Sequence, residues 1–270
     1  VQMVRRAQGD GRVLRAAVGI GVTEPMALPT QGVELAVMQD RLNADAWLAE
    51  FGSALGWAGA GSGSTAGLNA GTEARSSPSV VRADLMPRQV RIRARELLVL
   101  GRQLDEVVAT VVPAPAPARG WTADLSSTQM AGRIDWRSAA AGGPDRVTAR
   151  LKRLSIPAAS GNGEAGAAVE GRDESPMQWP ALDVVAEDFE LRGRRLGRLE
   201  IEADVRDAGR DWRLRRMSLQ HPDAALSATG SWASPADQRG SDARSTTMDL
   251  RVDLRNAGAL LSHMGYTEAV

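Results

Sequence analysis

The chain has 270 residues, with 33 basic and 33 acidic side chains and no formal net charge at pH 7. This balance removes the basic surface expected of a nucleic-acid-binding protein, so no nucleic acid is expected among its partners. The chain contains no cysteine, which excludes disulfides and thiolate metal sites and is compatible with the periplasm. No apolar run approaches the ~20 residues that a membrane-spanning helix needs.

Residues 1–55 are expected to form a β segment that ends in a short helix. Glycine and proline separate two predicted strands, over residues 12–20 and 32–38. Asn43 is a candidate cap for an amphipathic helix over residues 46–55, in which apolar side chains recur at helical spacing. We expect this helix to cover the sheet or one end of a groove.

The remaining chain divides into four segments by composition. Residues 56–79 read as a Gly/Ser-rich loop. Its run Gly59–Gly63 has the glycines of a phosphate-binding loop, but no Gly-Lys-Ser follows and no patterned helix begins there. A first β repeat is expected over residues 80–155, a flexible insertion over 156–179, and a second β repeat over 180–270 that continues beyond this chain.

The second repeat has the clearest pattern. Leu199, Ile201, Ala203 and Val205 alternate with Glu200, Glu202 and Asp204. A period of two places the apolar set on one face of a strand and the carboxylates, which we expect to be exposed, on the other. A solvated face is therefore favoured over a calcium site. His221-Pro222-Asp223 is interpreted as a turn between strands.

An earlier copy of this stretch occupies residues 90–136. Gly101 with the next three residues matches the run that begins at Gly193, and Trp121 matches Trp212. A repeat of this size indicates a continuing β architecture. Tryptophans recur at matching places in the two copies, and packing at strand ends is favoured over a sugar-stacking surface.

Residues for catalysis are not apparent. The two histidines, His221 and His263, have no metal-binding spacing, and there is no Gly-x-Ser-x-Gly motif. We therefore expect a non-enzymatic protein without cofactor or metal.

The order of landmarks resembles the YhdP branch of the AsmA-like proteins, in the TamB/AsmA superfamily. These landmarks cover most of the chain from Leu28 onward, and they are Leu28–Gly32, Leu42–Trp47, Gly193–Leu199, Trp212–Leu214, Pro222–Leu226, Gly230–Trp232, Met248–Leu254 and Leu260–Gly265. The resemblance implies a long twisted antiparallel β-sheet curled into a groove. It also implies a very long periplasmic protein of Gram-negative bacteria, anchored to the inner membrane by a segment absent from this chain, which would be an internal fragment.

The function implied by the resemblance is transport of phospholipid toward the outer membrane, with acyl chains in the groove. The expected partners are phospholipid acyl chains and, through parts outside this chain, the inner and outer membranes. The alternative is a structural or adhesive β-rich domain with a closed dry core. The residues expected to line the groove are Leu98, Leu100, Val107, Val111, Leu199, Ile201, Ala203, Val205, Leu214, Leu226, Ala228, Leu250, Val252 and Leu254.

Overall fold

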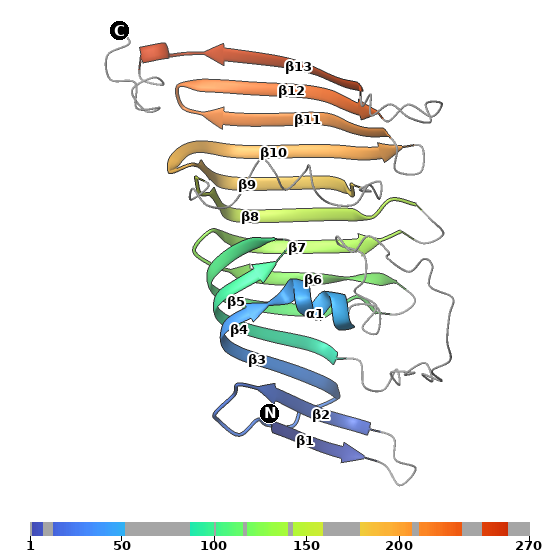
Figure 1. The fold of residues 1–270 in the computed structure, drawn as a ribbon. Helices are drawn as coiled ribbons and strands as arrows, with labels where there is room; N and C mark the ends of the chain where they lie inside the picture. The colour runs from blue at the N-terminus through green and yellow to red at the C-terminus, as the bar shows by residue number, and fades with distance from the viewer. Residues whose placement is uncertain are drawn as a thin grey trace, which may run out of the picture. The chain divides into compact units, whose positions relative to one another are not determined.

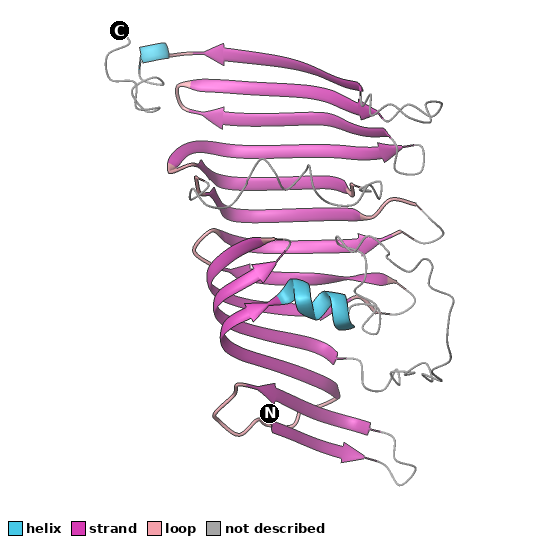
Figure 2. Ribbon diagram, viewed as in Figure 1, coloured by secondary structure: helices cyan, strands magenta, loops and turns pink. Residues whose placement is uncertain are grey.

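A computed structural model describes residues 2–7, 13–51, 87–99, 101–115, 118–139, 143–158, 179–206, 211–233 and 245–258. Nearly all of these residues lie in strands (Figures 1 and 2). The elements are β1 Gln2–Ala7, β2 Val13–Ile20, β3 Gly32–Asn43, α1 Ala44–Phe51, β4 Pro87–Val99, β5 Arg102–Pro113, β6 Arg119–Ser126, β7 Met130–Ser138, β8 Arg146–Ile156, β9 Ala181–Leu191, β10 Arg194–Arg206, β11 Asp211–His221, β12 Ala224–Ala233 and β13 Ser245–Leu254. None of the described helices is long and apolar enough to cross a membrane.

The strands follow one another in the sheet in their order along the chain, from β1 to β13. This confirms the predicted all-β class, with an open sheet and one short helix. The sheet is mixed, however, which corrects the expectation of a wholly antiparallel one. Parallel pairing joins β2 to β3, β3 to β4, and β8 to β9. A parallel pair needs a long crossover, and the low-complexity segments supply two of these connections.

The two stretches predicted as β repeats contain similar hairpins. The turn between β4 and β5 contains Gly101, and the turn between β9 and β10 contains Gly193, both with positive φ (69° and 77°). Each hairpin begins with a strand parallel to the one before it. Among the described residues, five strands, β4–β8, fall in the stretch predicted as the first repeat, and five, β9–β13, in the stretch predicted as the second. The predicted loops fall almost entirely outside the described residues.

The chain forms two compact units, Val1–Ala123 and Asp124–Val270. In the first unit, β3, β4 and β5 bend sharply along their length (Figure 1). Asp40, Arg95 and Glu106 lie opposite one another across these strands, between matched register pairs. Glu106 has a φ of 52°. On each strand, the buried residues on the two sides of this row lie an odd number of positions apart, so the buried positions change phase there. These residues are Val37 and Leu42 on β3, Ala94 and Leu97 on β4, and Val107 and Leu104 on β5.

This phase change acts like a bulge shared by three strands, although no strand gains a residue, because pairing stays one to one on both sides of the row. A bulge bends a strand and changes the face on which its following side chains lie. Because the buried positions change phase at the same row on all three strands, the residue pairing is kept while the sheet bends. The alternation in the sequence is interrupted at Asp40, Arg95 and Glu106 for this reason.

The helix α1 begins at Ala44, two residues before the predicted start. Asn43 caps it as predicted, since its Oδ1 accepts a hydrogen bond from the Ala46 amide at 2.9 Å. Asp45 Oδ2 accepts another from the Gly101 amide at 2.8 Å. This contact joins the start of the helix to the β4–β5 turn, so α1 lies at that end of the hairpin. The predicted residues beyond Phe51 lie outside the described part of the chain.

Candidate functional site

The second unit has one continuous apolar face, built from matched positions on neighbouring strands. Ile201 on β10 pairs with Met217 on β11, and Ala228 on β12 pairs with Leu250 on β13. Because side chains alternate along a strand, residues in such rows lie on the same face of the sheet. Four rows cross β10 to β13: Leu199–Leu219–Leu226–Val252, Ile201–Met217–Ala228–Leu250, Ala203–Leu214–Gly230–Met248 and Val205–Trp212–Trp232–Thr246.

These rows bring together the residues predicted on β10 to β13. The structure places them on one face, namely Leu199, Ile201, Ala203, Val205, Leu214, Leu226, Ala228, Leu250, Val252 and Leu254. Met217 and Leu219 also lie on this face, and alternation in the sequence does not predict them because β11 contains a bulge. The register shifts between Glu202 and Ala203 of β10, which places the extra residue in β11.

The same face continues onto β7, β8 and β9. Ile134 pairs with Ala149, Ala149 with Val184, and Val184 with Ile201. A buried cluster connects these strands and includes Ala186 and Leu199. We did not predict these positions as part of the face, although Val184 and Ala186 alternate in the sequence immediately before β10.

Burial on the apolar face decreases toward β13. Ala203 is completely buried, whereas Val252 is 48% exposed and Leu250 is 59% exposed. Among the described elements of this unit, the strands make their extensive contacts only with their neighbours in the sheet. No described helix or second sheet therefore covers the apolar side chains of β10 to β13.

The opposite face of the same strands is polar and ion-paired. Glu200 accepts from both Arg198 and Arg216, and Asp204 accepts from Arg215. Glu202 is exposed as predicted. The prediction that Glu200 and Asp204 are exposed is wrong, because the arginines cover their side chains, which remain only 20% and 22% exposed.

A further ion pair joins β8 to β9 on this polar face. Arg150 Nη2 lies 2.8 Å from Asp183 Oδ2. This hydrogen bond, with the charge of Arg150, lowers the pKa of Asp183 below its ordinary value. The face is thus charged but internally neutralised, and it contrasts with the aliphatic side.

In the first unit, Val107 and Val111 lie on one face of β5, together with the buried Ala109. Leu98, on the neighbouring strand β4, lies on the opposite face of the sheet. It is 37% exposed and pairs with Gln103, while its buried neighbour Leu97 pairs with Leu104. The bulge at Arg95 and Glu106 causes this difference, because it reverses the parity of the following positions. Leu100 lies outside the described residues.

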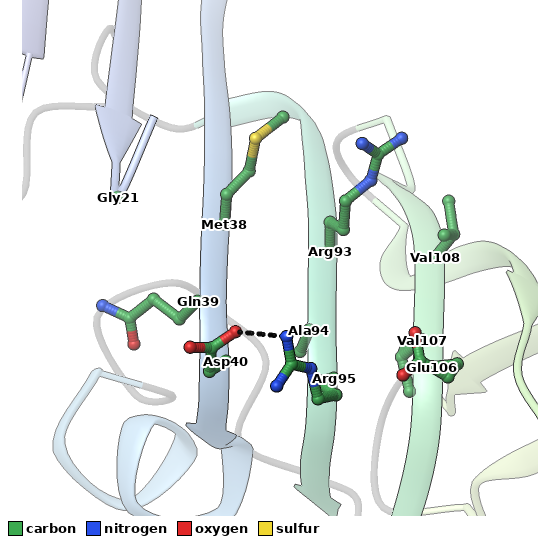
Figure 3. Close-up of a pocket in the computed structure, with 10 residues that line it drawn as sticks. All are labelled: Gly21, Met38, Gln39, Asp40, Arg93, Ala94, Arg95, Glu106, Val107 and Val108. Atoms are coloured by element: carbon green, nitrogen blue, oxygen red, sulfur yellow. Dashed lines mark ion pairs between the residues drawn. The ribbon is translucent and has the colours of Figure 1, made fainter. Parts of the chain in front are cut away.

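A shallow pocket of about 530 Å³ lies beside the shared bulge (Figure 3). An ion pair crosses it, with Arg95 Nη2 3.7 Å from Asp40 Oδ1. Arg93 and Glu106 also line it. Its lining carries four charged side chains, so this pocket lacks the aliphatic character of the apolar face in the second unit.

The described tryptophans of the second unit gather at one end of its strands. Trp212 and Trp232 pack edge to face with ring centroids 5.0 Å apart, and Trp179 lies 6.3 Å from Trp212. Trp212 Nε1 donates a hydrogen bond to the Pro180 carbonyl at 3.1 Å. Trp136 is 2% exposed. These contacts support packing as the role of Trp136, Trp212 and Trp232.

The remaining candidate motifs are structural. His221-Pro222-Asp223 forms a turn between β11 and β12 as predicted, and the Asp223 amide donates to His221 Nδ1 at 3.2 Å. In the part of the chain that the structure describes, no three His, Asp or Glu side chains form a cluster that could hold a metal ion.

Comparison with models of protein families shows which family the chain matches. The family model described as "YhdP protein" matches residues 1–270. No similar protein was found among curated proteins, and no solved structure matched. The YhdP family is AsmA-like, periplasmic and membrane-associated; in general it is a lipid-transport family, and it is not known for enzymatic activity. The match over the full sequence agrees with the open β-sheet and its apolar face, and the chain belongs to the YhdP family.

Proposed function

We propose that this chain is a non-enzymatic part of a periplasmic bridge that is anchored to the inner membrane and carries phospholipid toward the outer membrane. The acyl chains travel along the apolar face, with Ile201, Leu226 and Val252 near its centre. The observation that carries this proposal is the aliphatic face of β10 to β13, which no other described element covers. In the first unit, Val107 and Val111 are the corresponding proposed contacts.

The energetics favour acyl chains as the ligand. Each methylene that leaves water contributes about 0.8 kcal/mol. An aliphatic surface therefore binds hydrocarbon tails without any polar recognition, and it binds successive positions of a moving tail with nearly equal energy. The side chains suit this role because neighbouring rows are lined mainly by Leu, Ile, Val, Met and Ala.

The alternative function is a structural domain with a closed dry core. Such a core requires a second layer over the apolar rows, because two packed sheets bury their inner faces against each other. The described elements form one open sheet. Exposure of Leu250 and Val252 also favours the lipid path over the closed core.

A matched pair of neighbouring residues tests the proposal. Leu226 lies on the apolar face of β12, and Ser227 lies on its opposite, exposed face. A photoreactive amino acid at either position in the full-length protein should report what touches that face in cells. We expect phospholipid adducts from position 226 and few from position 227. Equal labelling at both positions, or no adduct at 226, would contradict the proposal.

A further inference from the structure

The turn between β9 and β10 carries an exposed group of arginines. Arg192, Arg194 and Arg195 occur within four residues and are all exposed. We call these three residues the arginine turn. Glu190 is the register partner of Arg195 across the hairpin, so three arginines face one carboxylate and the turn carries net positive charge.

Arg192 adopts a backbone conformation that is uncommon for its residue type. Its φ is 53°, and the next residue, Gly193, has a φ of 77°. Two-residue hairpin turns with two positive φ values favour asparagine, aspartate and glycine. A left-handed conformation is uncommon for other residues and is found where the surrounding structure enforces it. Here the Arg192 amide donates to the Ile156 carbonyl at 2.7 Å, which fixes the turn against β8.

The arginine turn lies at one end of the apolar face. Leu196, which follows it directly, packs against the buried cluster that contains Leu199 and Phe189. The β9–β10 turn and the β11–β12 turn lie at the same end of the strands (Figure 1). Cationic groups thus border the aliphatic surface at this end.

The opposite end of the same strands is occupied by aromatic rings. Trp212 pairs with Val205 near the end of β10 and with Trp232 on β12. The packed rings of Trp179, Trp212 and Trp232 make this end bulky, whereas the arginine turn is small and charged. The two ends of the apolar face therefore differ in chemistry.

The length of the strands sets how far a lipid held at the arginine turn can reach. From Leu199 to Val205 the strand rises about 20 Å at roughly 3.3 Å per residue. The hydrocarbon core of a bilayer is about 30 Å thick, so one leaflet contributes about 15 Å. Arg195 precedes Leu199 by four residues, about 13 Å along the strand. A phospholipid that lies parallel to the strands with its phosphate at the turn would therefore place its tail ends beside Leu199 and Ile201.

We propose that the arginine turn binds the phosphate of a phospholipid headgroup, with the acyl chains directed along the strands toward the tryptophans. Guanidinium groups bind phosphate oxygens through paired, charge-assisted hydrogen bonds. This inference rests on the proposed function and adds to it the orientation of the lipid and the residues that contact its headgroup.

Two photoreactive phospholipids test the orientation in the full-length protein. One carries a diazirine in its headgroup, and the other carries it at the end of an acyl chain. We expect the headgroup probe to label the peptide with residues 191–196, and the tail probe to label residues 199–201 of β10 or residues 217–219 of β11. The reversed pattern, or equal labelling of both regions by both probes, would overturn the orientation and leave the proposed function intact. No labelling of the second unit by either probe would contradict both.

Substitutions test the role of the arginines. Arg192→Gly, combined with Arg194→Gln and Arg195→Gln, keeps a residue suited to the turn and removes its charge. We expect headgroup labelling at the turn to fall at least fivefold while tail labelling persists. The matched control is Arg137→Gln with Arg146→Gln, a paired set near the tryptophan end, which should leave labelling unchanged.

A membrane surface is the competing partner for such a basic group. If the triple variant loses binding to vesicles containing anionic lipid but keeps its headgroup labelling, the arginine turn contacts a membrane and the inference is wrong. An equal loss of labelling in the control variant would also contradict it, because the effect would then follow total charge.

Discussion

The difference in burial along the apolar face leads to a prediction with a defined magnitude. Val252 on β13 is 48% exposed, whereas Ala203 on β10 is completely buried. Burying a whole valine side chain contributes about 1.5–3 kcal/mol. Val252→Asp loses about half of this, and water solvates its carboxylate, so the cost should be about 1 kcal/mol. Ala203→Asp instead places an unpaired charge in a buried site, which costs several kcal/mol.

Amide hydrogen exchange in the full-length protein measures both effects locally. For Val252→Asp we expect exchange in β12 and β13 to be roughly fivefold faster, as a change of about 1 kcal/mol implies. For Ala203→Asp we expect protection to be lost across β9, β10 and β11. If Val252→Asp removes protection as completely as Ala203→Asp, the exposed row is part of a closed core and the reasoning is refuted.

Three other substitutions test separate features of the sheet. Asp183→Asn should destabilise the second unit at neutral pH, because Arg150 lowers the folded-state pKa of Asp183. The stabilisation from this ion pair is present above the ordinary pKa of 3.8 and is lost as pH falls through the lower folded value. Acid titrations of the two proteins should therefore converge below this range, and a constant gap would contradict it. Glu106→Gly should stabilise the first unit by up to about 1 kcal/mol in chemical denaturation, because glycine accepts the φ of 52° without strain; a clear loss would show that the Glu106 side chain matters more. Trp136→Ala should cost about 3–5 kcal/mol by the same assay, as for other buried large side chains, and a loss below 1 kcal/mol would be inconsistent with its 2% exposure.

Alternation in the sequence was a reliable guide where strands are regular. Residues 199–205 and 248–254 alternate without interruption, and both stretches place their apolar side chains on one face as predicted. The cap at Asn43 and the His221-Pro222-Asp223 turn were also predictable, since each depends on local hydrogen bonding.

Irregular pairing between strands limits what alternation in the sequence can predict. On β11 an extra residue near Arg215 shifts the apolar positions, so Met217 and Leu219 were not predicted. At Glu106 the buried positions also change phase, here on three strands at one row and without an added residue, and this separates Leu98 from Val107. Either change reverses the face of every later position, and no periodicity within a single strand reveals where it occurs.

Parallel pairing was missed for a related reason. The sequence shows that β8 and β9 are strands separated by a long segment without periodicity, but strand direction depends on where that segment returns. The pairing of Ala149 with Val184 is a tertiary contact and leaves no local pattern. The burial of carboxylates on the polar face was likewise not predicted, because Arg216 covers Glu200 only in the observed register of the two strands.

Native mass spectrometry of the purified full-length protein tests the central claim most directly. We expect wild-type protein to retain phospholipid, Val252→Asp to lose it while remaining folded, and the opposite-face control Asp253→Ala to retain it. Asp253 is the neighbour of Val252 and pairs with Arg251 on the exposed polar side. Equal lipid retention by all three folded proteins, or no bound phospholipid in the wild type, would contradict the assignment of the apolar face as the lipid path.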